Sequence, residues 1–352
     1  MNHLGDMLNP CIQRMARYNC FQAHEAGCDN ADEVVSDGPV GVALTGIRHL
    51  LTQFPAIADD GELTTADVCH RYVKPATGPD GWECVAQVVD LNKGWYSHTY
   101  RNRATGAVQD HPPVSSVGGG ATTSSYADVL RRDPATAACV GPAHVFVSHA
   151  WQYRFADLVA ALEGLVARAD NAFTADGTYF WLDCVVIDEH DTAAKPEDYW
   201  STSFRESIRA IGRTVMVLTP WDSPVPLTRS WCLWELFCTV DTGAAFSVAL
   251  PPEQEGQLVA ALRQDPGRLL SAVSTIDVAR AQAGKESDRA MILDSVRRSD
   301  GGTARLNELA GRVMREWAVE TLDRVLAGMR EEGDWGGLSH SSRMTQQGTR
   351  RS

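Results

Sequence analysis

The segment from His144 to Val240 constrains the fold of this chain more than any other. It contains three short apolar runs, Val145–Val147, Thr178–Leu182 and Thr214–Leu218, and each is followed at once by polar residues. Consecutive apolar residues predict strands that are covered on both faces, as in parallel sheets. Helical patterns separate the runs, so the segment predicts a doubly wound α/β sheet. Its polar residues should gather at the carboxyl edge of the strands, where such sheets bind ligands.

Apolar residues with a period of 3.6 predict the helices that cover this sheet. Ser203 and Glu206 form a capping box at the start of one of them. The expected elements beyond the three strands are helices over 40–54, 153–169, 230–240 and about 304–329, one helix beginning at Ser203, a fourth strand over 244–250 and a fifth near 270–276.

Composition divides the rest of the chain around the sheet. Residues 82–113 hold an aromatic cluster, and a run of glycines at 118–120 follows in a linker-like stretch. Because Gly and Pro flank this insertion, we expect few contacts across its boundary. The predicted order is an N-terminal helical region (1–81), a β insertion (82–113), a linker with a short helix (114–142), the sheet domain (143–250), a helical extension (251–335) and a polar tail expected to be disordered (336–352).

Charge and cysteine content limit the partners and the compartment. The net charge of −13 makes a nucleic-acid backbone an unfavourable partner. No apolar run approaches the length that spans a membrane, and the first residues lack the features of a signal peptide. Nine scattered cysteines favour free, mostly buried thiols in the cytoplasm. Cys11, Cys20, Cys28 and His24 contain no C-x2-C pair, so we expect no metal site there. We also expect no resident cofactor.

Glu235 is the candidate residue with the most distinctive setting. On a helical projection Leu233 and Leu236 belong to the apolar face, and Glu235 points nearly opposite, so we expect it outside the core. It lies in the first turns of its helix, where the macrodipole favours the ionised carboxylate. A carboxylate beside an indole such as that of Trp231 can hold sugar hydroxyls or stabilise an oxocarbenium ion. A solvated surface glutamate is the alternative, and periodicity alone favours it.

Further candidates end the strands at the same edge. For Asp183, bracing of the following loop and contact with a ligand are equally favoured. Ser148 and His149 are adjacent on a strand and point to opposite faces, so they cannot act together as nucleophile and base. For His149 we favour a role as a packing residue or a hydrogen-bonded residue at the rim. The tryptophans divide into two expected core residues, Trp181 and Trp234, and two expected rim residues, Trp151 and Trp231.

Three motifs within about residues 143–250 resemble the TIR domain family. They are Phe146-Val-Ser-His149, Trp181-Leu-Asp183 and Ser230-Trp-Cys-Leu-Trp-Glu-Leu236, and their order agrees with that of the family. The last motif is fairly specific. Together, the strings FVSHAW and WCLWEL are similar to a divergent branch of microbial and algal TIR-like proteins.

The resemblance implies a flavodoxin-like fold and one of two activities. One is self-association, or association with other TIR domains, as a signalling module. The other is cleavage of NAD at the nicotinamide–ribose bond, switched on by oligomerisation, with NAD as substrate rather than cofactor. The family's catalytic glutamate falls on Glu235, and the expected substrate-binding residues are Ser148, His149, Trp151, Asp183 and Trp231. Two departures stand out: Ala150 and Trp151 replace a basic residue common after the first strand, and the loop over 183–198 is longer and more acidic than usual.

Residues 82–113 weakly resemble a WW domain. Trp82 corresponds to the first tryptophan and Pro113 to the closing proline, whereas the second tryptophan is replaced near Asp110. A β insertion without a ligand is the favoured interpretation. Binding of proline-rich peptides by this segment is the alternative.

Overall fold

The computed structural model describes residues 38–79, 82–90, 95–110, 123–168, 172–192, 195–196, 199–274 and 276–331. The predicted tail and the N-terminal cysteines lie outside these residues. The strands are β1 (Val40–Ala43), β2 (Trp82–Asp90), β3 (Trp95–Asn102), β4 (Val108–Gln109), β5 (Val140–Pro142), β6 (Val145–Ser148), β7 (Tyr179–Trp181), β8 (Arg213–Val217) and β9 (Ala245–Ala249). The longer helices are α2 (Leu44–Gln53), α6 (Tyr126–Arg132), α7 (Phe155–Ala167), α9 (Tyr199–Ile211), α10 (Ser230–Asp241), α11 (Pro252–Gln264), α13 (Glu286–Arg298) and α14 (Gly302–Glu331). The shorter ones are α3 (Pro55–Asp59), α4 (Thr65–Val68), the π-helix η1 (Cys69–Val73), α5 (Lys74–Ala76), α8 (Asp183–Val186) and α12 (Gly267–Ala272).

The main sheet has six strands in the order β5-β1-β7-β6-β8-β9. The four strands β7, β6, β8 and β9 are parallel, and β1 and β5 extend the sheet in antiparallel pairing. Numbered along the chain, the parallel strands have the order 2-1-3-4, which is that of flavodoxin-like folds. The predicted α/β class with a flavodoxin-like sheet is therefore confirmed. The reversal of strand order lies between β6 and β8.

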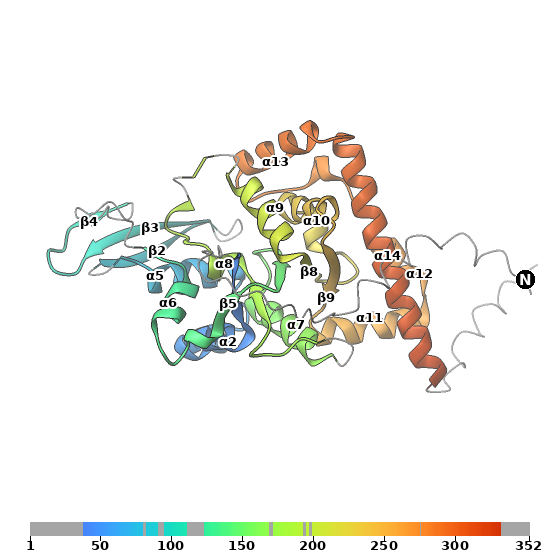
Figure 1. The fold of residues 1–352 in the computed structure, drawn as a ribbon, viewed down its shortest axis with the longest axis horizontal. Coiled ribbons are helices and arrows are strands. Elements are labelled where there is room, and N and C mark those ends of the chain that lie inside the picture. The colour runs from blue at the N-terminus through green and yellow to red at the C-terminus, as the bar shows by residue number, and fades with distance from the viewer. Residues whose placement is uncertain are drawn as a thin grey trace, which may run out of the picture. The chain divides into compact units, whose positions relative to one another are not determined.

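Alternation along β6 sends its side chains to two separate cores. Val145 and Val147 pack with α2 and α7 on one face, whereas Phe146 packs with α9 and α10 on the other. Figure 1 shows α9 and α10 above the sheet and α2 and α7 below it. Since successive strand residues alternate between faces, Ser148 belongs to the α10 face.

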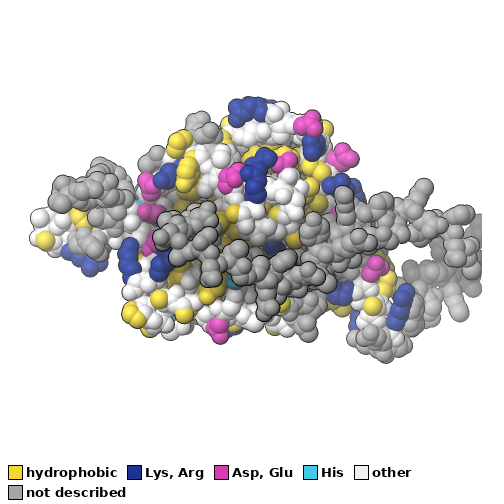
Figure 2. Space-filling model, viewed as in Figure 1, with side chains coloured by type: hydrophobic (Ala, Val, Ile, Leu, Met, Phe, Trp, Pro, Cys, Tyr) yellow, Lys and Arg dark blue, Asp and Glu magenta, His cyan; other side chains and the backbone are white. Residues whose placement is uncertain are grey.

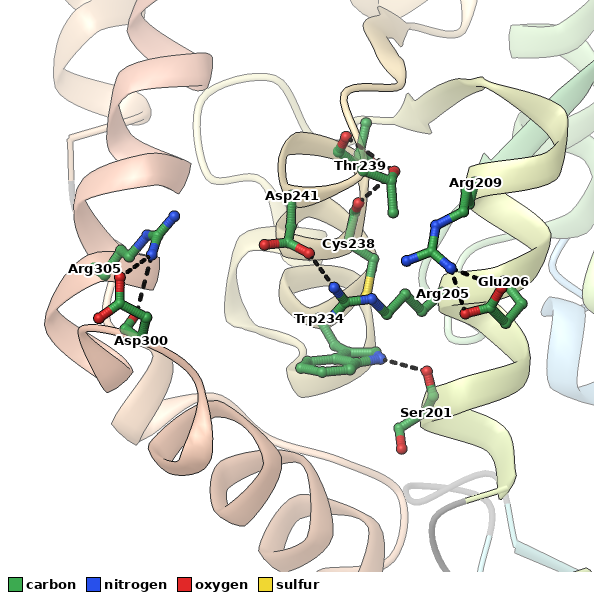
Figure 3. Close-up of polar contacts among 11 residues, drawn as sticks. Ser201, Arg205, Glu206, Arg209, Trp234, Cys238, Thr239, Asp241, Asp300 and Arg305 are labelled. Atoms are coloured by element: carbon green, nitrogen blue, oxygen red, sulfur yellow. Dashed lines mark hydrogen bonds and ion pairs between the residues drawn. The ribbon is translucent and has the colours of Figure 1, made fainter.

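The C-terminal extension forms a second layer over α10. Its helices α13 and α14 pack against α10 on the side away from the sheet (Figure 1). Helix α9 is joined to α10 by a hydrogen bond from Trp234 Nε1 to the carbonyl of Ser201 (3.1 Å) and by an ion pair between Arg205 and Asp241 (Figure 3). Helix α10 is consequently covered on all sides, and Trp234 is buried as predicted.

Three of the predicted elements are wrong. The helix expected to begin at a capping box of Ser203 and Glu206 begins at Tyr199 as α9, so both residues lie inside the helix, because the helix extends one turn further toward the N-terminus. The helix expected over 40–54 begins only at Leu44, because the preceding residues form strand β1 between β5 and β7. The fifth strand expected near 270–276 is replaced by helix α12, which buries Leu269 and, just after its end, Val273, one helical turn apart. Four- to six-residue apolar runs fit either element, so their tertiary partners decide between helix and strand.

The β insertion forms a three-stranded antiparallel sheet, β2-β3-β4. Alternate residues of β3 face the rest of the protein. Tyr96 donates a hydrogen bond to Asp67, His98 Nε2 lies 3.3 Å from the carbonyl oxygen of His70, and Tyr100 is buried. The insertion is thus joined to the N-terminal helices through one face of β3, more closely than its flanking Gly and Pro residues predict.

Candidate functional site

A buried hydroxyl–carboxyl pair lies at the carboxyl edge of β6. Ser148 is the last residue of β6, and its Oγ donates a hydrogen bond to Glu235 Oε2 at 2.6 Å. Ser148 is fully buried and Glu235 is 6% exposed. The pair joins the sheet to α10 beside the strand reversal between β6 and β8, the place where open α/β sheets bind ligands.

The burial of Glu235 contradicts the expectation that it lies outside the core. Helix periodicity correctly places it away from Leu233 and Leu236. The face that carries Glu235, however, lies against the end of β6, and α9, α13 and α14 pack on other sides of the helix, so residues 232–239 of α10 are all buried. A local sequence pattern does not show that this polar face of the helix packs against the sheet.

The protonation of Glu235 also differs from the expected ionised state. Burial raises the pKa of its carboxyl well above the ordinary value, the hydrogen bond from Ser148 opposes this rise, and the charge of Asp183 adds to it. Desolvation therefore outweighs the helix macrodipole, and burial favours the protonated carboxyl. A cation placed beside Glu235 would restore the carboxylate.

Asp183 and Trp151 form a second pair at the same edge. Trp151 Nε1 donates to Asp183 Oδ2 at 2.7 Å, and Asp183 Oδ1 accepts from the backbone N–H of Cys184 at 2.7 Å. Asp183 therefore braces the segment that follows it, one of its two expected roles, because its carboxylate binds both the start of α8 and the indole of Trp151. Trp151 is half-buried, which agrees with a position at the rim.

His149 is buried beside this edge but makes no hydrogen bond with Ser148. Its Nε2 has no partner among the described residues, and burial lowers its pKa, with Asp183 opposing that shift. Its carbonyl accepts a weak hydrogen bond from Cys232 Sγ at 3.4 Å. These contacts agree with the packing role favoured for His149.

Trp231 lies with the outer layer rather than with the other candidates. Its Nε1 donates to Asp288 Oδ2 of α13 at 3.3 Å, and its ring centre is 5.2 Å from that of Phe204. The structure therefore brings Ser148 together with Glu235, and Trp151 together with Asp183. Trp231 contacts neither pair in the recorded hydrogen bonds and ring contacts of the described residues.

An aromatic cluster next to Trp151 was missed by sequence reasoning. The His70 ring stacks on Tyr96 (4.8 Å between centres), lies 5.2 Å from His98 and meets the edge of Trp151 at 6.0 Å. The His70 Nδ1 is buried without a hydrogen-bond partner among the described residues, and burial lowers the pKa of His70 to about 3. The four rings come from three separate parts of the chain, η1, β3 and the segment after β6, so no single motif marks them.

Two further buried polar residues follow α8. Glu189 is 8% exposed, and burial, reinforced by Asp183, raises its pKa to about 8. His190 is bound on both nitrogens, by Tyr100 OH to Nδ1 at 2.6 Å and by Thr77 Oγ1 to Nε2 at 3.1 Å. The acidic loop expected over 183–198 therefore packs against the β insertion at His190.

Comparison of the chain with protein-family models, with curated proteins and with solved structures finds no match. In the described part of the chain, no group of His, Cys, Asp and Glu side chains is arranged to hold a metal ion. Within the same residues, no helix is both long and apolar enough to cross a membrane. Basic and acidic side chains are interspersed on the face shown in Figure 2.

Proposed function

We propose that this chain is a TIR-like protein that cleaves the nicotinamide–ribose bond of NAD, with Glu235 as the catalytic carboxyl group. The observation that carries this proposal is the buried Glu235 carboxyl, 2.6 Å from Ser148 Oγ, at the carboxyl edge of β6. The sheet order and the three TIR-like motifs support the same assignment.

The chemistry needs a carboxylate beside the ribose. When the bond between ribose C1′ and the ring nitrogen breaks, the nitrogen keeps the electron pair and leaves as neutral nicotinamide. Positive charge then develops on the ribose, where a carboxylate can stabilise it until water adds and releases a proton. The nicotinamide ring of NAD is cationic, so its binding favours the ionised form of Glu235.

Access to Glu235 requires a change from the state described above. At 6% exposure its carboxyl is closed to a dinucleotide, so catalysis needs the segments that cover the carboxyl to move. We assign this change to self-association or association with another TIR domain, which matches the implied switching by oligomerisation. The free cysteines of the described residues, Cys69, Cys84, Cys139, Cys184, Cys232 and Cys238, fit the proposed cytoplasmic location.

The direct test is incubation of the purified full chain with NAD and quantification of released nicotinamide. Glu235→Gln keeps the volume of the side chain and an acceptor for Ser148, so it separates chemistry from folding. We expect nicotinamide from the wild type and none from Glu235→Gln at an unchanged melting temperature or a higher one. Equal release by both proteins would remove Glu235 from the mechanism.

A non-catalytic TIR-like assembly module is the second candidate. The burial of Glu235 favours it, because the Ser148–Glu235 pair would then serve only to join α10 to β6. In that case the wild type releases no nicotinamide at any protein concentration, and self-association remains. Binding of proline-rich peptides by the β insertion is a third candidate, for which the exposed Val88, Val89 and Val108 offer an apolar surface.

A further inference from the structure

A separate cavity of about 220 Å³ lies at the outer edge of the sheet. Its walls come from the end of α7, the carboxyl half of β9, α11 and α14. Strand β9 lies two positions from β6 in the sheet order, and the residues that line the cavity include neither Ser148 nor Glu235. A ligand bound here therefore occupies a site separate from that of the proposed reaction.

Helical spacing and two glycines explain why this space is open. Trp317, Thr321, Arg324 and Gly328 recur at intervals of four, three and four residues, so they share one face of α14. Gly328 contributes no side chain, and a Cβ built there would meet no atom within 4 Å. Gly164 of α7 also lines the cavity, again without a side chain.

The lining combines an apolar floor with concentrated positive charge. Trp317 and Leu258 are buried, whereas Arg168, Arg263 and Arg324 bring three guanidinium groups to the lining. Glu255 is the one acidic residue of this lining, 3.9 Å from Arg324. A local excess of arginine is unexpected in a chain with a net charge of −13, and guanidinium groups bind carboxylates and phosphates.

Thr321 provides an independent indication of a ligand. It is 6% exposed and lines the cavity, and its Oγ is buried without a hydrogen-bond partner among the described residues. A buried hydroxyl without a partner destabilises a fold, so such groups call for an explanation. A polar ligand atom in the cavity would satisfy this hydroxyl.

We propose that this cavity is a binding site for a small aromatic anion, a single ring that carries one carboxylate or phosphate group. An apolar cavity of about 150 Å³ is large enough to bind benzene, so the larger volume found here leaves room for a substituent. The ring packs on Trp317 and the apolar floor, the anionic group meets the arginines, and Thr321 donates a hydrogen bond.

The test is calorimetric titration of the full chain with benzoate and with phenyl phosphate, and with uncharged benzamide as the matched control ligand. We expect saturable binding of at least one anion at millimolar concentration and much weaker binding of benzamide. Arg263→Gln should weaken anion binding by about tenfold, the effect of losing one charge-assisted hydrogen bond. Gly328→Leu should abolish binding by filling the cavity from a position that accommodates a side chain.

Two variants distinguish binding in the cavity from nonspecific attraction of anions to the protein surface. Thr321→Val should weaken binding of the anion without lowering the melting temperature, because it removes an unpaired hydroxyl at nearly constant volume. Glu235→Gln should leave anion binding unchanged, so the result does not depend on the proposed NAD chemistry. Failure of both anions to bind, or binding that persists unchanged in Gly328→Leu and Arg263→Gln, would overturn the proposal.

Discussion

Glu189→Gln should stabilise the fold at high pH, where the wild-type carboxyl has to ionise while it is buried. Glu189 is buried behind α8 with a pKa raised from 4.5 to about 8. At about 1.4 kcal/mol per pKa unit, this shift corresponds to an upper limit of about 5 kcal/mol lost when the carboxyl ionises inside the folded protein.

The sign follows from proton binding. Between pH 4.5 and about 8 the folded chain keeps the Glu189 proton and the unfolded chain releases it, so stability falls as the pH rises through this window. Burial lowers the pKa of His70, His98 and His190, which produces the opposite trend at lower pH. The variant and the wild type must therefore be compared at the same pH.

Urea unfolding of both proteins at pH 5 and pH 9 measures the effect. Glutamine keeps the volume and carries no charge, so Glu189→Gln should resemble the wild type at pH 5 and exceed its stability by up to about 5 kcal/mol at pH 9. Glu286→Gln, at a side chain 77% exposed, is the matched control and should change little at either pH. An equal stability difference at the two pH values would refute the assigned burial of the Glu189 carboxyl.

Three substitutions test the contacts around the site by urea unfolding. Tyr100→Phe leaves the buried His190 Nδ1 without its partner and should cost about 1–3 kcal/mol; no change would mean that this hydrogen bond is absent. Trp151→Phe removes the indole N–H that donates to Asp183 and should lower the free energy of unfolding by about 1.5–3 kcal/mol. An unchanged free energy of unfolding would mean that this hydrogen bond is absent. Leu233→Ala, at a fully buried position, should cost about 2–5 kcal/mol, whereas a loss below about 1 kcal/mol would show that α10 is not enclosed.

The central strands were predictable because each carries its own signal. The predicted strand over 244–250 corresponds to β9 over Ala245–Ala249, and the runs at Val145 and Thr214 mark β6 and β8 within one residue. Consecutive apolar residues between two helical patterns predict a strand and its parallel direction, even when the neighbouring strands are unknown. In contrast, β1 is a four-residue stretch that forms a strand through antiparallel pairing with distant segments, and no local pattern contains that pairing.

The candidate site was predictable in some of its members but not in its environment, since Trp231 was expected at this edge and contacts α13 instead. Alternation in β6 and the phase of α10 place Ser148 and Glu235 at one edge of the sheet, and the structure joins them at 2.6 Å. The burial that raises the pKa of Glu235 comes with the packing of α10 against the end of β6, and the contact of His70 with Trp151 depends on how η1 packs. Such long-range packing determines the protonation of Glu235 and His70, and neither periodicity nor residue spacing predicts it.

The most direct test of the central claim is the rate of nicotinamide release per molecule, measured over a range of protein concentrations with Glu235→Gln as control. If Glu235 is catalytic and is uncovered by assembly, the wild-type rate per molecule rises with concentration and the variant releases nothing. Absence of release from the wild type at every concentration, or the same release from Glu235→Gln, would contradict the account.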